Sequence, residues 1–148
     1  MTVHRHRFRV RYGETDQMGF VHHSVYLLYF EEGRTGLLRE LGRSYAELER
    51  SGTVLPVVDA GLRFRTPARY DEELVVEARV TEVTGVRVRF DYRVLHAADG
   101  ATYNTAMAFV DVGKVPEFSC AFPFRVKQGT KLKGLQIESA TLDLSKLN

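Results

Sequence analysis

One long apolar segment, residues 24–41, constrains the fold of this chain more than any other feature. It reads SVYLLYFEEGRTGLLREL, and Val25, Leu28 and Tyr29 recur at the spacing of helical turns. This spacing predicts an α-helix. Leu27 extends the apolar surface around the first half of the segment, so we expect that half to be buried on most of its sides.

Two glycines interrupt the same segment one helical turn apart. Gly33 and Gly36 each weaken a helix by about 1 kcal/mol relative to alanine. A neighbouring backbone that packs closely against the helix would explain both positions. Gly42 is expected to end the helix. Ser44 and Glu47 form a capping box, which predicts a short second helix that runs to about residue 50.

The segment before the long helix alternates strictly. Residues 4–12 read HRHRFRVRY, and a period of two predicts a strand with one solvated, basic face. No aromatic residue alternates with the arginines on that face, so we favour a solvated surface over nucleic-acid binding. The expected inner face holds His4, His6, Phe8, Val10 and Tyr12, and the expected outer face holds Arg5, Arg7, Arg9 and Arg11.

Four later segments also have strand character. Pro56 interrupts the first, which suits an edge strand, and Asp99-Gly100 is a strong hairpin signal between the last two. Together with the N-terminal strand they predict an α+β fold, a mostly antiparallel sheet of five strands around one long helix. The open edges of such a sheet favour a partner subunit. The four expected strands are residues 54–65, 73–83, 86–95 and 102–112.

Length, charge and cysteine content exclude several classes of protein. The chain has 148 residues and a net charge of +2, so we expect one domain and no nucleic-acid or membrane partner. The single cysteine, Cys120, excludes an internal disulfide and suits a reducing compartment. The N-terminus lacks the apolar region of a secretory signal, and no apolar run approaches the roughly 20 residues of a membrane helix. These features predict a cytoplasmic protein.

A carboxylate lies in the turn that precedes the long helix. Asp16 stands between Gly13 and Gly19, where the chain is expected to turn. A helix N-terminus offers unpaired N–H groups and partial positive charge. A carboxylate beside it suggests a site where an oxygen with developing negative charge is held next to a base or nucleophile. The alternative is that Asp16 only forms an Asx turn.

The same region resembles a known enzyme family. Residues 12–26 read YGETDQMGFVHHSVY, and they are followed by Tyr29, Phe30, Glu31, Glu32 and Arg34. The pattern is similar to that of the hotdog-fold acyl-CoA thioesterases, in particular the 4-hydroxybenzoyl-CoA thioesterase family and the Tol-Pal-associated thioesterases. The resemblance implies a hotdog domain over residues 1–125, in which a sheet wraps one central helix. It also implies obligate homodimers or homotetramers with active sites at the subunit interface.

The activity that the resemblance implies is hydrolysis of an acyl-CoA to free coenzyme A and a carboxylic acid, without a metal or redox cofactor. The family's catalytic carboxylate falls on Asp16, which would attack the thioester carbonyl or act as base for water. Its oxyanion-binding backbone amide falls on His23. Gly19 would let the backbone approach the thioester, and Tyr26 would line the acyl pocket.

Arginines are expected near the site because coenzyme A carries phosphates. Arg87 and Arg89 are candidates, as are Arg63, Arg65 and Arg69. Ordinary solvated arginine is the competing interpretation for each of them.

Other interpretations remain open at this point. Glu31 and Glu32 are rival catalytic carboxylates, although we favour surface ion pairs with Arg34 and Arg39. A metal site at His22 and His23 is not expected, because neighbouring residues on a helix point in different directions. A non-catalytic acyl-CoA-binding or interaction module of the same fold is the alternative function. Residues 126–148 are polar, and we interpret them as a disordered or added extension outside the core.

Overall fold

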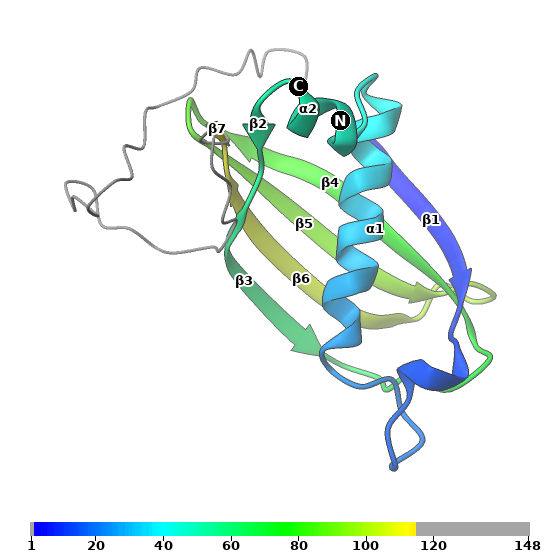
Figure 1. Cartoon of the computed structure of the whole chain (residues 1–148). Coiled ribbons are helices and arrows are strands. Elements are labelled where there is room, and N and C mark those ends of the chain that lie inside the picture. The colour runs from blue at the N-terminus through cyan, green and yellow to red at the C-terminus, as the bar shows by residue number, and fades with distance from the viewer. Residues whose placement is uncertain (1, 115–148) are drawn as a thin grey trace.

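The computed structural model describes residues 2–114, and the predictions for Cys120 and residues 126–148 lie outside that range. Five strands form one antiparallel sheet in the order β1-β4-β5-β6-β3, and the long helix lies across one face of it (Figure 1). The predicted α+β fold with one long central helix is confirmed. The elements are β1 (Val3–Arg9), the 3-10 turn η1 (Tyr12–Glu14), α1 (Val25–Glu40), α2 (Tyr45–Arg50), β2 (Thr53–Val54), β3 (Val57–Phe64), β4 (Glu73–Val83), β5 (Arg87–His96), β6 (Thr102–Asp111) and β7 (Gly113–Lys114).

The core lies between α1 and the inner face of the sheet. Residues of one parity along β5, such as Val88, Phe90 and Val94, are at most 2% exposed. They pack under α1 together with Leu37 from the helix and Val76 from β4. The arginines of β1 and β5 point to the opposite, outer face, as the alternation predicts.

Both helix glycines mark a close approach between α1 and the sheet. A Cβ on Gly33 would lie 3.2 Å from the Ala78 Cβ and 3.3 Å from a Val76 methyl group. A Cβ on Gly36 would overlap the His4 imidazole. The prediction of close packing is confirmed, but the neighbours are side chains of β4 and β1 rather than backbone.

The sequence predictions for the N-terminal strand and for the first half of the long helix were each wrong in one detail. The first strand ends at Arg9, and Tyr12 begins η1 with 78% of its surface exposed, so Tyr12 is not an inner-face residue. The first half of α1 is not buried all round, because Leu27 is 48% exposed and Leu28 is 56% exposed. One chain therefore covers only one side of this apolar helix.

The region around Pro56 forms two strands rather than one. β2 pairs with β7, and β3 follows the proline and lies at the edge of the main sheet, as the proline predicts. Neither helix of the described residues is long and apolar enough to cross a membrane.

Candidate active site

A small hairpin joins η1 to α1 (Figure 1), and Asp16 lies in its turn. Thr15 and Val21 form an antiparallel bridge. The Asp16 N–H donates to the Phe20 carbonyl at 2.9 Å, and the Gly19 N–H donates to the Asp16 carbonyl at 2.9 Å. Gly19 has a φ of +78°, in the left-handed region that glycine adopts without strain. The tight turn predicted at Gly19 is confirmed.

The Asp16 carboxylate is only half engaged by this turn. Its Oδ1 accepts hydrogen bonds from the Met18 N–H at 2.9 Å and from the Phe20 N–H at 3.5 Å. This is the Asx turn that was one of the two sequence interpretations. Within residues 2–114, no hydrogen bond reaches Oδ2, so this oxygen is available to a substrate or a water molecule.

Glu14 anchors the hairpin to the body of the molecule. Its side chain is buried, and Oε2 accepts from the Arg11 N–H at 2.8 Å and from the Tyr29 hydroxyl at 2.9 Å. Oε1 accepts from the Arg11 guanidinium at 2.7 Å. The Glu14 carbonyl accepts from the His22 N–H at 2.9 Å. One residue therefore fixes η1, the approach to α1 and the helix itself relative to one another.

The ionisation of this cluster follows from its contacts. Burial raises the pKa of Glu14, but the hydrogen bonds from Arg11 and Tyr29 outweigh it and leave the pKa below its usual value. Burial, together with the adjacent Glu14 carboxylate, raises the pKa of Tyr29. At neutral pH a protonated Tyr29 hydroxyl therefore donates to an ionised Glu14.

His23 lies directly before Ser24, the residue that precedes the first turn of α1. Its side chain is exposed, and its ring lies 4.2 Å from that of His22 between centroids. In the described part of the chain, no group accepts a hydrogen bond from the His23 N–H. The neighbouring His22 N–H is already bonded to Glu14. The His23 amide is therefore an available donor at the start of the helix.

The described residues contain no group of three or more His, Cys, Asp or Glu side chains that could hold a metal ion.

Tyr26 is part of the core beneath the first turn of α1. It is 2% exposed, and its ring contacts those of Phe64 and Tyr29 edge-on at 5.4 and 5.8 Å. Burial raises the pKa of Tyr26. Phe64, at the end of β3, is 52% exposed and presents this aromatic cluster to the outside.

The structure does not bring Arg87 and Arg89 to Asp16 within one chain. Both lie on the outer face of the sheet, at the end of β5 remote from the start of α1 (Figure 1). Arg87 makes two hydrogen bonds to Asp111, at 2.5 and 3.1 Å, and Arg89 donates to Asp91 at 2.9 Å.

Arg69, by contrast, lies beside the hairpin. Its guanidinium carbon is 4.6 Å from the centroid of the Phe20 ring. Its Nη1 is 3.9 Å from the position that a Cβ on Gly19 would occupy. Of the arginines considered from sequence, Arg69 is thus the one that the structure places against the Asp16 turn.

The rival carboxylates of α1 are exposed and point away from the sheet. Glu31 and Glu32 form no ion pair within the described ranges, so the predicted pairs with Arg34 and Arg39 were wrong. Arg34 instead donates to the Tyr92 hydroxyl at 3.4 Å. Both glutamates therefore lie on the exposed side of α1, away from the core.

The five-stranded antiparallel sheet around one long helix, with the carboxylate turn before that helix, defines a hotdog fold. The Thioesterase-like superfamily matches residues 10–126 of this chain. The chain belongs to this superfamily and is an enzyme of the thioester hydrolase class.

Two curated relatives cover most of the chain. YneP of Bacillus subtilis (strain 168) is 34% identical over 127 residues, which are 83% of this chain and 92% of YneP. The acyl-CoA thioesterase YbgC of Haemophilus influenzae is 35% identical over 121 residues, 80% of this chain and 88% of YbgC.

Solved structures share the fold. The DHNA-CoA thioesterase of Staphylococcus aureus aligns with a TM-score of 0.74 at 28% identity, over 77% of this chain and 76% of that one. A hypothetical protein of Thermus thermophilus aligns with a TM-score of 0.73 at 37% identity, over 78% of this chain and 91% of that one.

Proposed function

We propose that this chain is an acyl-CoA thioesterase that hydrolyses its substrate to free coenzyme A and a carboxylic acid. The observation that carries the proposal is that the Asp16 Oδ2 and the His23 N–H both lack a hydrogen-bond partner within residues 2–114. Asp16 lies in the turn of the hairpin, and His23 lies where the chain leaves the hairpin for α1. The relative YbgC, which is named an acyl-CoA thioesterase, supports the choice of thioester.

The reaction needs a base or nucleophile and a donor for the developing oxyanion. In one route Asp16 takes a proton from water, and the oxygen of that water attacks the thioester carbonyl. In the other route Asp16 attacks the carbonyl itself, and water then hydrolyses the mixed anhydride. In both routes the His23 N–H donates to the oxyanion. Collapse of the tetrahedral intermediate expels the coenzyme A thiolate, which takes up a proton.

The walls of the proposed site come from residues around the hairpin. Gly19 leaves space for the thioester to approach the backbone, and Arg69 beside it supplies positive charge toward the coenzyme A phosphates. Tyr26 supports the exposed ring of Phe64, and together they form an apolar wall for the acyl group. Arg87 and Arg89 would meet substrate only if it were bound to another subunit.

We also propose that the enzyme is a homo-oligomer with shared active sites. In one chain the Asp16 hairpin projects from the end of the molecule where α1 begins (Figure 1). The adjoining surface of α1 exposes Leu27 and Leu28. A second subunit would cover these apolar side chains and close the open side of the site.

The decisive experiment measures free thiol released from a panel of aromatic, short aliphatic and medium-chain acyl-CoA thioesters. The wild type is expected to turn over part of the panel. Asp16→Asn is expected to lose at least about a hundredfold in kcat, the scale for removal of a general base. Glu31→Gln and Glu32→Gln are the matched controls, and both are expected to keep wild-type activity.

Other results would point elsewhere. Equal activity of wild type and Asp16→Asn would show that another residue is the catalytic carboxylate. Loss of activity in Glu31→Gln or Glu32→Gln would assign that role to a glutamate of α1. Binding of acyl-CoA without turnover by the wild type would favour the non-catalytic module of the same fold.

A further inference from the structure

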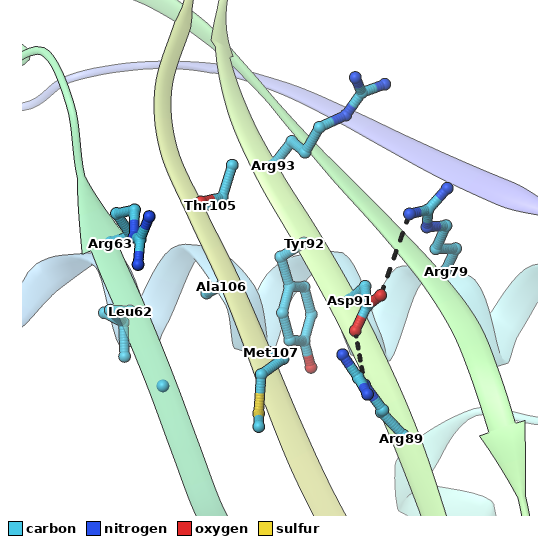
Figure 2. Close-up of a pocket in the computed structure, with 11 residues that line it drawn as sticks. Leu62, Arg63, Arg79, Arg89, Asp91, Tyr92, Arg93, Thr105, Ala106 and Met107 are labelled. Atoms are coloured by element: carbon cyan, nitrogen blue, oxygen red, sulfur yellow. Dashed lines mark hydrogen bonds and ion pairs between the residues drawn. The ribbon is translucent and has the colours of Figure 1, made fainter.

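The outer face of the sheet carries a depression that lies outside the proposed catalytic site. Its volume is about 450 Å³, and it lies over β3, β6 and β5 on the side away from α1 (Figure 2). Thr105 and Met107 of β6 form part of its floor. Gly61 of β3 widens it, since a side chain there would reach toward Met107, whose Cγ and Sδ are 3.9 Å from the Cβ position.

Arginines from three strands surround this floor. Arg63 of β3 stands on one side, and Arg79 of β4 with Arg89 and Arg93 of β5 stand on the other (Figure 2). Within residues 2–114, Arg63 has no hydrogen-bond or ion-pair partner. Its exposed guanidinium has all its donors available to a ligand.

The carboxylates nearby do not neutralise the group. Asp91 is the one acidic residue of the lining, and it is shared by Arg89 at 2.9 Å and Arg79 at 3.9 Å. Glu77, outside the lining, is shared by Arg93 and by Arg5 of β1. Five guanidinium groups thus face two carboxylates.

The more distant acids of this face lie near other arginines. Asp111 is held by Arg87, and Asp59 raises the pKa of that same arginine. Glu73 pairs with Arg7 of β1, on the same face but at the edge of the sheet opposite to β3.

Glu82 stands opposite Arg89 in the β4–β5 register and also raises the pKa of Arg87, so it offsets part of the positive charge at that end. Within the described range, the unpaired guanidinium of Arg63 is the positive charge that stays available at the depression.

Part of this group is held in place before any ligand arrives. The Arg89 guanidinium is fixed by its bond to Asp91, and its carbon lies 5.7 Å from the centroid of the Phe109 ring. Arginines held by carboxylates and aromatic rings lose less side-chain entropy when they bind an anion.

We propose that this depression is a binding site for a phosphate-bearing ligand, and in particular for a pyrophosphate group. Arginine forks match phosphate oxygens. The cationic groups stand on two sides of a floor about one strand wide. A ligand with several anionic oxygens can contact both sides, whereas a single carboxylate would reach only one. The Thr105 hydroxyl adds a neutral donor on the floor, and Met107 offers an apolar surface to the uncharged part of a nucleotide.

Two kinds of ligand carry such a phosphate group to this face of the sheet. One is the nucleotide end of a coenzyme A whose acyl group lies in the site of a neighbouring subunit. The other is a free nucleotide that binds independently of the reaction. In both cases the phosphate groups of the ligand would bind the same arginines.

The test measures binding of inorganic pyrophosphate and of adenosine 3′,5′-bisphosphate to the full chain by titration calorimetry. Arg63→Gln is expected to weaken both by about tenfold, the scale for loss of a charged hydrogen-bond donor. Met107→Glu leaves every arginine in place but adds a negative charge to the floor, and it is expected to weaken binding at least as much. Arg7→Gln, on the same face but outside the depression, is the matched control.

Kinetics then distinguish the two sources. If the ligand is the end of coenzyme A, pyrophosphate competes with acyl-CoA, and Arg63→Gln raises KM while kcat is unchanged. If it is a free nucleotide, pyrophosphate does not compete and KM is unchanged. The proposal is overturned if wild type binds neither probe at millimolar concentration, or if Arg7→Gln weakens binding as much as Arg63→Gln. Binding is measured without turnover, so failure of the thioesterase proposal would not affect this result.

Discussion

Glu14 is the buried charge that holds the candidate site together, and its contacts make a specific prediction about pH. Glu14→Gln is expected to destabilise the protein at pH 7 by about 1–3 kcal/mol, because the charged acceptor of Arg11 and Tyr29 is lost. The pKa of Glu14 is lowered in the folded state. Its contribution is therefore complete above the ordinary carboxyl pKa of about 4.3, and it is lost as the pH falls through the lower folded value.

Urea unfolding of wild type and Glu14→Gln at pH 7 and at pH 3 measures this effect. The difference in unfolding free energy between the two proteins should shrink at pH 3. An equal difference at both values would show that the carboxylate's charge is not what matters. Glu32→Gln, at an exposed position, should show no difference at either pH.

Single residues of the candidate site were predictable only where the residue type itself favours a particular turn. Asp16 and Gly19 could be placed from sequence because an Asx turn and a left-handed glycine are local properties. The partnership of Glu14 with Tyr29 could not be, because it joins residues 15 apart through tertiary packing. From sequence, an acid three residues after Arg11 is equally compatible with a surface ion pair.

At the scale of single elements, the two glycines of α1 allow a matched comparison. Gly33→Ala gains about 1 kcal/mol of helix propensity, but its methyl group would lie 3.2 Å from the Ala78 Cβ and 3.3 Å from Val76. The Ala78 Cβ is fixed to the β4 backbone and Val76 is fully buried, so a shift of either disturbs the core and net destabilisation of about 1–2 kcal/mol is expected.

The three atoms nearest to a Cβ on Gly36 all belong to the His4 ring, a side chain that can turn aside at the expense of its bond to Glu40. We therefore expect Gly36→Ala to lie closer to the wild type than Gly33→Ala. Thermal and urea unfolding of the two variants measure this order. Equal stabilisation of both would mean that the helix sits further from the sheet than described.

The strands were largely predictable because their alternation reports a half-buried sheet. The segment expected at 86–95 corresponds to β5, and the one at 102–112 corresponds to β6. Alternation also placed Arg87 and Arg89 on the outer face. It could not show that they lie at the far end of the sheet from Asp16, because the pattern of one strand carries no information on the direction of its neighbours.

At the scale of the whole molecule, the sequence prediction failed for apolar surfaces that a single chain leaves exposed. Leu27 and Leu28 looked like core residues, because apolar periodicity does not distinguish a neighbour in the same chain from one in another. The long strand β3 is likewise an edge, paired only with β6 among the described residues. The opposite edge, β1, carries exposed Arg5, Arg7 and Arg9, which oppose edge-to-edge pairing.

The edge of β3 carries the last prediction, that two copies of the chain meet there. Ala60 pairs with the buried Ala108, so its side chain faces the α1 side of the sheet, yet it remains exposed. A charge at that position would have to be buried when a second subunit covers the edge. We therefore expect Ala60→Glu to shift the protein toward monomer and to reduce thioesterase activity, because the proposed sites are shared. Ala98→Glu, the same substitution in the exposed turn between β5 and β6, should have no effect.

Size-exclusion chromatography with light scattering at micromolar concentration measures the outcome. The wild type and Ala98→Glu should show no monomer, and Ala60→Glu should show a concentration-dependent monomer. A stable wild-type monomer with full activity would contradict the shared site, since every catalytic group would then lie in one chain. A wild-type oligomer that Ala60→Glu leaves intact would instead place the contact on the exposed face of α1, where Leu27 and Leu28 are the side chains that a partner would bury.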